Sequence, residues 1–203
     1  MVHQTRGRRI IFFGDSITEM GASEEGYVAL VREHLAAREP SAEIIGAGVG
    51  GNKVTDLRLR LERDVLKKDP DIVVIYIGIN DVWHTALPDH AGTSVVVFRV
   101  ILEEIVSHLK AAGCRVILCT PSVIGERWDG SNPLDGSLEE YAGVIRKVAL
   151  EMEVGLCDLR TIFIEYLRVH NTENSESGVL TTDSVHLNDA GNKLVADQLN
   201  EHL

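Results

Sequence analysis

Short apolar runs alternate along this chain with longer stretches whose apolar residues recur at helical spacing. The runs cover residues 10–13, 43–45, 72–77, 116–119 and 155–157, and each is typical of a buried strand. The periodic stretches predict helices over residues 27–35, 54–65, 95–109, 137–152 and 159–169, and a last helix through residues 194–199. Because strand and helix alternate five times, the pattern predicts a parallel sheet with right-handed crossovers and helices on both faces.

The strand order decides which turns lie close together. A doubly wound sheet of five strands most often takes the order 2-1-3-4-5, which places the first strand between the second and the third. The turns that follow these three strands then meet at one crevice. No internal repeat, low-complexity tract or change in composition divides the chain, so we expect residues 1–203 to form one α/β domain.

A serine stands at the carboxyl end of the first predicted strand, in Gly14-Asp15-Ser16. A serine hydroxyl attacks carbonyl carbon only when a base removes its proton, and the usual base is a histidine oriented by a carboxylate. Asp183-x-x-His186 places both groups within one turn, before the last helix. Taken singly, a polar turn and a solvated loop histidine are the simpler interpretations of these two motifs.

Attack on an ester also requires donors that face the developing oxyanion, and loss of one donor typically costs about 10²–10³ in rate. Three donors follow strands that meet at the predicted crevice. They are the backbone N–H groups of Ser16 and Gly51 and the side-chain amide of Asn80. The convergence of these donors with the serine and the histidine favours nucleophilic catalysis.

Four segments resemble the conserved blocks of the SGNH hydrolases, also called GDSL esterases and lipases, and the resemblance runs from residue 10 to the end. The segments are Gly14-Asp15-Ser16, Gly48-Val49-Gly50-Gly51-Asn52, Gly78-Ile79-Asn80-Asp81 and Asp183-Ser184-Val185-His186. The resemblance implies a three-layer, flavodoxin-like fold and a serine esterase without a cofactor. It implies that Ser16 is the nucleophile, His186 the base and Asp183 its orienter, and that Ser16, Gly51 and Asn80 form the oxyanion hole.

The resemblance to small members of the family also suggests short acyl esters as substrates, such as acetyl groups on carbohydrates. Four side chains near the crevice are expected to bind that substrate, together with Arg127: Asp15, Tyr27, Trp83 and Trp128. The long loop over residues 120–136 carries two prolines and three glycines, and is either a cover or a surface excursion. Ile17 stands where the family often has leucine, which is a conservative exchange.

Other functions also fit parts of the sequence. Gly46-x-Gly48-x-x-Gly51 has the form of a dinucleotide fingerprint, but it follows the second strand and leaves Ser16 and His186 without a role. A non-catalytic binding module of the same shape is a second alternative, and an acyltransferase, thioesterase or lysophospholipase would use the same fold. Asp81, His84, Asp89 and His90 share one polar loop, where solvated side chains are expected rather than a metal site.

Net charge, hydropathy and cysteine number limit the classes of partner and the compartment that we expect. The net charge of −11 argues against nucleic acid and anionic membranes, and no run approaches the ~20 apolar residues of a membrane span. The chain has an odd number of cysteines, Cys114, Cys119 and Cys157. The last two lie in predicted strands, so we expect buried, reduced thiols in a cytoplasmic protein. The expected partner is therefore a small-molecule ester, and the sequence carries no signal of oligomeric state.

Overall fold

The sheet of the computed structural model, which describes residues 6–203, has five parallel strands. They are β1 (Arg9–Gly14), β2 (Glu43–Gly48), β3 (Ile72–Tyr76), β4 (Arg115–Cys119) and β5 (Gly155–Cys157). Their order is β2-β1-β3-β4-β5, as predicted from the sequence. Residues 10–13 of β1 are fully buried and β3 is at most 3% exposed. These strands are covered on both faces, which is why they form unbroken apolar runs in the sequence.

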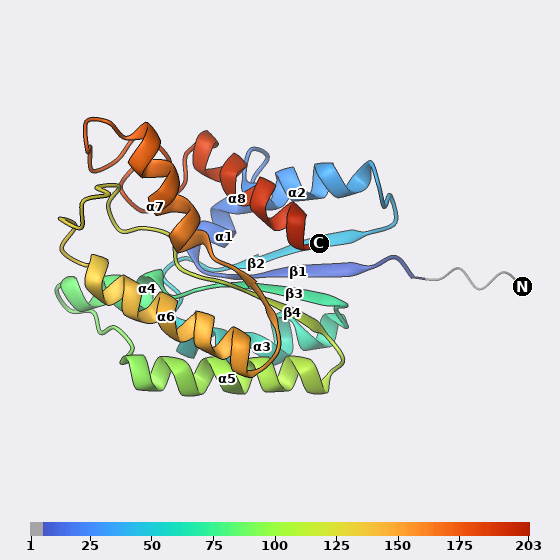
Figure 1. The fold of residues 1–203 in the computed structure, drawn as a ribbon. Helices are drawn as coiled ribbons and strands as arrows, with labels where there is room; N and C mark the ends of the chain where they lie inside the picture. Colours follow the sequence, from blue (N-terminus) through green and yellow to red (C-terminus); the bar gives the residue numbers. More distant parts are fainter. Residues whose placement is uncertain (1–5) are drawn as a thin grey trace, which may run out of the picture.

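Helices form a layer on each side of the sheet (Figure 1). On one face lie α1 (Ser16–Gly21), α2 (Tyr27–Ala36), α7 (Leu159–His170) and α8 (Asp189–His202). The other face carries α3 (Val54–Asp64), α5 (Val95–Ala111) and α6 (Asp135–Glu151). The short α4 (Ile79–Trp83) follows β3, and two 3-10 turns complete the elements, η1 (Leu66–Lys68) and η2 (His84–Ala86). This arrangement is the predicted three-layer, flavodoxin-like fold.

The glycines after the second predicted strand have a packing role. Strand β2 continues through Gly46 to Gly48, beyond its predicted end, and the unpredicted helix α1 lies against it. A Cβ on Gly48 would stand 2.0 Å from the backbone nitrogen of Glu19, and one on Gly46 would stand 2.7 Å from Cβ of Ala22. The close approach of a helix to a strand therefore explains these glycines without a bound dinucleotide.

One of two helix starts differs from the sequence expectation. Helix α2 begins at Tyr27, as predicted, with Gly26 as its N-cap and no side chain that caps it. Helix α6 begins at Asp135, two residues before its predicted start at Ser137. The carboxylate of Asp135 forms an ion pair with Arg160 at 2.8 Å, which holds the first turn against α7. A tertiary contact thus decides a boundary that local capping signals misplace.

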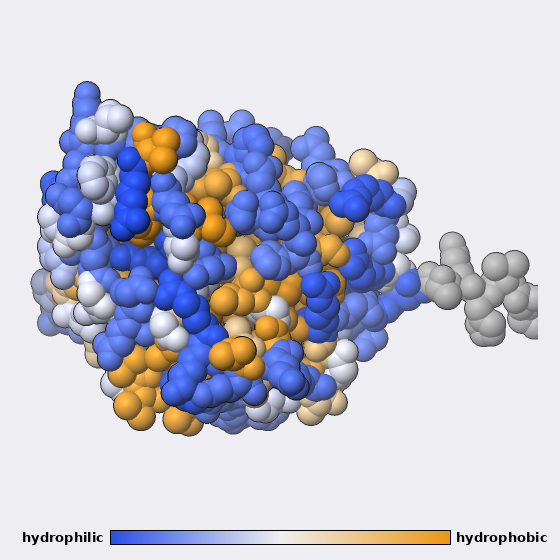
Figure 2. All heavy atoms as spheres, viewed as in Figure 1, coloured by the Kyte–Doolittle hydropathy of each residue, from blue (hydrophilic) through white to orange (hydrophobic). Residues whose placement is uncertain are grey.

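Polar side chains cover most of the surface in Figure 2. Orange atoms gather at the lower left, where Figure 1 shows the start of α5, and the exposed apolar residues Val96, Val97 and Val100 belong to this helix. Within residues 6–203, none of the helices combines the length and the apolar character that a membrane crossing requires.

Candidate active site

Ser16, His186 and Asp183 form one hydrogen-bonded chain at the carboxyl edge of the sheet. The Ser16 Oγ atom lies 3.0 Å from Nε2 of His186, and Nδ1 of that histidine lies 2.7 Å from Oδ2 of Asp183. Because a carboxylate only accepts hydrogen bonds, we assign the ring proton to Nδ1. The Nε2 lone pair is then free to accept the serine proton, so the geometry is that of a nucleophile with its base.

A tight turn brings Asp183 and His186 together. Oδ1 of Asp183 accepts the backbone N–H groups of Val185 at 3.1 Å and of His186 at 2.8 Å. Ser184, which lies between Asp183 and Val185, adopts a φ of +78°, a conformation that residues other than glycine rarely take. Burial alone would raise the pKa of Asp183, but the hydrogen bonds from His186 and Val185 hold it below its ordinary value. The carboxylate therefore stays charged beside the imidazole at neutral pH.

The strand order brings the three expected oxyanion donors to the same edge. Gly14 at the end of β1 lies opposite Gly48 of β2 and Tyr76 of β3. Ser16, Gly51 and Asn80 follow these residues by two, three and four positions. The order β2-β1-β3 therefore brings Ser16, Gly51 and Asn80 to the same edge of the sheet.

Gly51 and Asn80 occupy specific local conformations. Gly51 has a φ of +74°, and a Cβ there would meet no protein atom within 4 Å. The glycine therefore satisfies the backbone conformation, and the space beside it stays open. Asn80 is 3% exposed, and its side-chain amide donates one hydrogen bond to the Asn52 carbonyl at 3.1 Å. An amide nitrogen has two donors, so one N–H remains for a substrate oxygen.

Arg60 of α3 connects the loop that carries Gly51 to the ends of strands β1 and β2. Its guanidinium donates to the carbonyls of Gly14 at 2.6 Å and Ala47 at 2.9 Å, and to Oδ1 of Asn52 at 2.7 Å. It also stacks over the Phe13 ring at 4.4 Å. Sequence analysis missed this residue, although a signal exists: Arg60 lies three positions after Leu57, on the apolar face of α3.

Asp81 holds the residue that follows the Gly51 loop, Val54, and its carboxylate is used within the protein and not as a metal ligand. Its carboxylate is completely buried and accepts the backbone N–H of Val54 at 3.2 Å, which caps α3. Burial raises the pKa of Asp81 to about 6, against the hydrogen bonds that it accepts. His84 and His90 contact each other through their rings. Across residues 6–203 no three His, Cys, Asp or Glu side chains gather as metal ligands.

Two of the expected substrate-binding residues do not reach the surface. Tyr27 is fully buried, and its hydroxyl donates to Oγ1 of Thr18 at 2.9 Å. Asp15 is 2% exposed and caps α1 by accepting the backbone N–H of Ile17 at 3.0 Å. Both side chains are engaged within the protein, so their expected role in substrate binding finds no support in their positions. Both residues support the serine turn from below.

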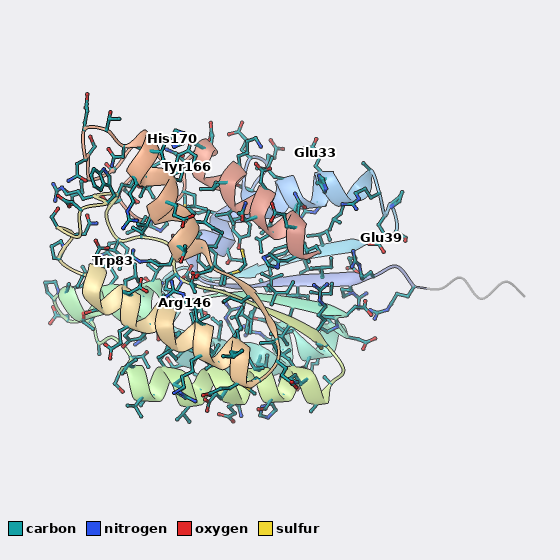
Figure 3. The ribbon with its side chains drawn as sticks, viewed as in Figure 1. Glu33, Glu39, Trp83, Arg146, Tyr166 and His170 are labelled. Carbon is teal, nitrogen blue, oxygen red and sulfur yellow. The ribbon has the colours of Figure 1, made fainter. Side chains whose placement is uncertain are left out.

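Trp83 has the placement that a binding residue requires. Figure 3 shows it beyond the carboxyl ends of the strands, and its ring stands edge-on to the His186 ring at 6.4 Å. It lines a cavity of about 350 Å³ beside Asp183, together with Ile124 and Val185. A larger cavity of about 590 Å³ lies between α2 and α8 and has none of these residues in its wall.

Trp128 and Arg127 lie outside the wall of the cavity beside Asp183. The indole N–H of Trp128 donates to the Asn171 carbonyl at 2.9 Å, and Arg127 pairs with Glu176 at 3.1 Å. Both contacts join the loop over residues 120–136 to the segment that follows α7. The expected role of Trp128 in substrate binding stays a prediction.

The raised pKa of Asp15 predicts how stability depends on pH. Burial first, and the nearby Asp81 charge, raise the pKa of Asp15 from 3.8 to about 7, although the Ile17 N–H opposes the change. Between pH 4 and 7 the folded protein keeps a proton that the unfolded chain releases, so stability falls as the pH rises. The loss across this window is about 4 kcal/mol.

We expect Asp15→Asn to remove the part of this slope that Asp15 causes, while the raised pKa of Asp81 leaves the rest, because asparagine still accepts the Ile17 N–H but carries no charge. Urea unfolding at pH 4 and pH 8 measures the effect. The variant should be more stable than the wild-type protein at pH 8, and the difference should vanish at pH 4. Equal pH dependence in both proteins would contradict the assigned pKa of Asp15.

Comparison with known proteins agrees with this geometry. The model of the GDSL-like Lipase/Acylhydrolase family matches residues 12–194. An acetylxylan esterase from Geobacillus stearothermophilus is 32% identical over 206 residues, covering 94% of this chain and 91% of that protein. A Rattus norvegicus protein named isoamyl acetate-hydrolyzing esterase 1 homolog is 25% identical, covering 92% of this chain and 78% of that protein.

Solved structures extend the likeness to the fold. The acetyl xylan esterase AlAXEase has a TM-score of 0.93 and 45% identity, covering 96% of this chain and 99% of its own. Axe2, an acetylxylan esterase from Geobacillus stearothermophilus, has a TM-score of 0.83 and 28% identity, covering 96% and 93%. Structures of Axe2 include catalytic mutants in which a serine, an aspartate or a histidine is replaced by alanine. The chain therefore belongs to the GDSL-like lipase and acylhydrolase family, the SGNH hydrolases, and is a carboxylic ester hydrolase.

Proposed function

We propose that the chain is a serine acetylesterase that removes O-acetyl groups from carbohydrates through an acyl-enzyme on Ser16. The observation that carries the mechanism is the continuous hydrogen-bonded chain from Ser16 through His186 to Asp183. The substrate class is supported by the relatives, since acetylxylan esterase and isoamyl acetate-hydrolyzing esterase are both named for acetate esters. No step requires a cofactor or a metal ion.

Acylation begins when the Ser16 oxygen attacks the ester carbonyl carbon and Nε2 of His186 accepts the hydroxyl proton. The carbonyl oxygen becomes an oxyanion, which accepts hydrogen bonds from the N–H groups of Ser16 and Gly51 and from the Asn80 amide. Collapse of the tetrahedral intermediate breaks the bond to the alcohol oxygen. His186 returns its proton to that oxygen, and the sugar leaves with a free hydroxyl.

Deacylation repeats these steps with water. Nε2 of His186 accepts a proton from a water molecule, whose oxygen attacks the acetyl carbon bound to Ser16. The second oxyanion forms in the same set of donors, and its collapse releases acetate and restores the serine hydroxyl. Asp183 keeps Nδ1 protonated and stabilises the imidazolium that forms in both halves of the reaction.

The position of Trp83 supports a role on the leaving-group side. Its ring lies beside His186, and the cavity that it lines also borders Asp183. Flat aromatic faces suit the apolar face of a sugar ring, whereas the hydroxyl groups of the sugar stay accessible to water. We assign Trp83 to contact the carbohydrate that carries the acetyl group.

Two substrate series test this function. Wild-type protein should hydrolyse p-nitrophenyl acetate fastest, with kcat/KM falling as the acyl chain lengthens to octanoate. On acetylated xylo-oligosaccharides, released acetate measures activity toward carbohydrate esters, and Trp83→Ala should raise KM there more than for p-nitrophenyl acetate. A preference for octanoate, or hydrolysis of p-nitrophenyl acetate without any release from the sugar, would contradict the carbohydrate substrate.

We place this activity in the cytoplasm. The placement is supported by Cys114, Cys119 and Cys157, which are buried and free of disulfide bonds, as in proteins of a reducing compartment. Fractionation of cells that express the native gene tests it, since recovery of the protein outside the cytoplasmic fraction would contradict the placement.

A further inference from the structure

A buried carboxylate that the reaction does not use stands behind the catalytic turn. Glu126 is completely buried, and within residues 6–203 no lysine or arginine pairs with its carboxylate. Four donors from one short segment surround it instead. Oε2 accepts the backbone N–H of Val179 at 2.8 Å, and Oε1 accepts that of Leu180 at 2.7 Å. Oε1 also accepts both the backbone N–H and the hydroxyl of Thr181.

The segment held by Glu126 leads directly into the catalytic turn. Thr181 forms a β-bridge with Leu187, and the Thr182 N–H donates to the His186 carbonyl at 2.8 Å. Asp183 and His186 lie between the two bridged residues, in the hairpin turn over residues 179–187. A carboxylate that fixes three successive N–H groups therefore fixes the base of the hairpin that carries both residues.

The residue before Glu126 holds the tip of the same hairpin. The Gly125 N–H donates to the Ser184 carbonyl at 2.8 Å, which steadies the residue that adopts a φ of +78°. Gly125 itself has a φ of +94°, and a Cβ on it would stand 2.2 Å from Oδ1 of Asn132. Glu126 therefore holds the base of the hairpin through its side chain, and Gly125 holds the tip through its backbone N–H.

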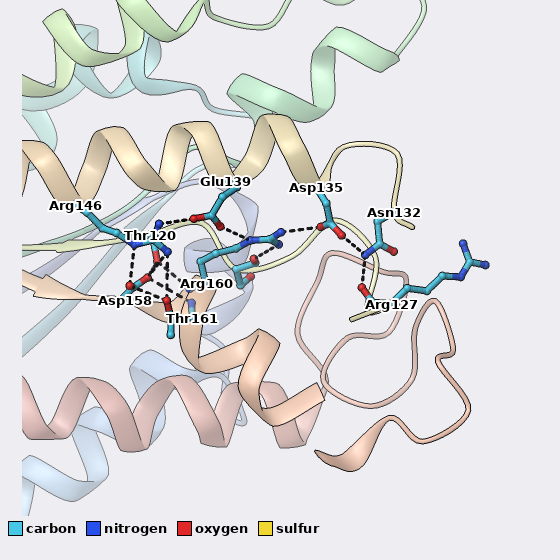
Figure 4. A network of polar contacts seen from close by, with 10 residues as sticks. Thr120, Arg127, Asn132, Asp135, Glu139, Arg146, Asp158, Arg160 and Thr161 are labelled. Carbon is cyan, nitrogen blue, oxygen red and sulfur yellow. Dashed lines mark hydrogen bonds and ion pairs between the residues drawn. The ribbon is translucent and has the colours of Figure 1, made fainter. Parts of the chain in front are cut away.

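The loop that carries Glu126 is anchored at both ends by charged groups (Figure 4). At its start, Thr120 donates to Asp158 at 2.9 Å. The buried guanidinium of Arg160 donates to the Ser122 carbonyl at 3.0 Å and to Asp135 at 2.8 Å, which joins the start of the loop to its end. Hydrogen bonds therefore hold the loop over residues 120–136 at both of its ends, on either side of Glu126.

We propose that Glu126 is a positioning residue of this hydrolase, whose buried carboxylate holds the hairpin over residues 179–187 so that His186 faces Ser16. The proposal rests on the catalytic role given to these residues under the proposed function. Glu126 touches neither the substrate nor the reacting atoms, so its loss should lower kcat and leave KM nearly unchanged. A residue that only stabilised the fold would lower the melting temperature without changing kcat of the folded protein.

Graded substitutions separate these two roles. Glu126→Gln keeps one acceptor oxygen for Leu180 and Thr181 but turns an amide donor toward the Val179 N–H. Glu126→Ala removes every acceptor, and Thr181→Val removes only the hydroxyl donor. Since a displacement of about 1 Å can cost about 10²-fold in rate, we expect kcat to fall ~10-fold in Glu126→Gln and ~10²-fold in Glu126→Ala, with a smaller loss in Thr181→Val.

Leu109→Ala is the matched control, because Leu109 is fully buried in α5, on the opposite face of the sheet from α8. It should lower the melting temperature and leave kcat on p-nitrophenyl acetate within twofold of wild type. If Glu126→Gln and Thr181→Val behave like this control, with a lower melting temperature and unchanged kcat, the positioning role is wrong. This comparison remains decisive if Glu126→Ala does not fold.

A second readout does not depend on turnover. The ring ¹⁵N and ¹³C signals of His186, assigned with His186→Gln, report the hydrogen bonds at Nδ1 and Nε2. They should move in Glu126→Gln and stay in place in Leu109→Ala, even if the wild-type protein hydrolyses none of the esters tested. In that case the proposed function fails and the positioning of His186 stands. Unchanged His186 signals in Glu126→Gln would overturn the proposal for either outcome of the activity assay.

Discussion

Replacement of Ser16 by alanine should lower kcat for p-nitrophenyl acetate by about 10⁴- to 10⁶-fold, the range typical of a lost serine nucleophile. The reason is geometric: Ser16 supplies the oxygen that lies 3.0 Å from Nε2 of His186. Alanine retains the backbone N–H and suits the first turn of α1. The melting temperature of Ser16→Ala should therefore stay within a few degrees of wild type, and stopped assays with concentrated enzyme measure the residual rate.

Ser107→Ala provides the control for this experiment. Ser107 is exposed on α5, and its hydroxyl donates within the same helix to the Glu103 carbonyl. This variant should retain full activity. Residual hydrolysis by Ser16→Ala above one per cent of wild type, with a covalent acyl group on another residue by mass spectrometry, would refute the assignment of the nucleophile.

Replacement of Asp183 by asparagine should lower kcat by about 10⁴-fold and change the fold little. The Asn oxygen still accepts the backbone N–H groups of Val185 and His186, so the turn is retained. The Asn amide, however, donates to Nδ1 of His186 and drives the ring proton to Nε2. That nitrogen then donates toward Ser16 and cannot accept its proton.

The matched control is Asp189→Asn, an exposed aspartate in the first turn of α8. It should leave kcat within twofold of wild type. Asp183→Asn should also still bind a substrate-like alcohol product with near-normal affinity, because only the proton transfer is disturbed. Activity of Asp183→Asn within tenfold of wild type would show that the carboxylate is not needed to orient His186.

The fold was predictable because its information is local. Strands β1 and β3 are buried on both faces and therefore form unbroken apolar runs, and the crossover helices show their own periodicity. The positions of Ser16, Gly51 and Asn80 follow once the strand order is known, since each residue comes directly after one of three neighbouring strands. Proximity of Asp183 to His186 follows from a spacing of three residues. These features needed no knowledge of distant contacts.

The roles of buried polar side chains were not predictable in this way. Tyr27 has the same sequence signature whether it lines a pocket or packs in the core, and only its hydrogen bond to Thr18 decides between them. Asp15 is an acid beside the nucleophile, and its burial depends on the helix that it caps. Glu126 is a charged loop residue whose partners lie 53–55 positions later in the chain, so no local pattern indicates its burial.

Arg60 limits how this enzyme can be redesigned. Its guanidinium donates hydrogen bonds to Gly14 at the end of β1, to Ala47 near the end of β2 and to Asn52, which follows Gly51. A graft that replaces residues 49–53 to accept a different ester must therefore keep an acceptor at position 52. Without it, a change made for substrate preference would free the guanidinium that also holds the Gly14 carbonyl. Libraries that vary this loop should hold Asn52 and Arg60 constant as a pair and vary Val49 and Gly50, whose side chains or surroundings are open to solvent.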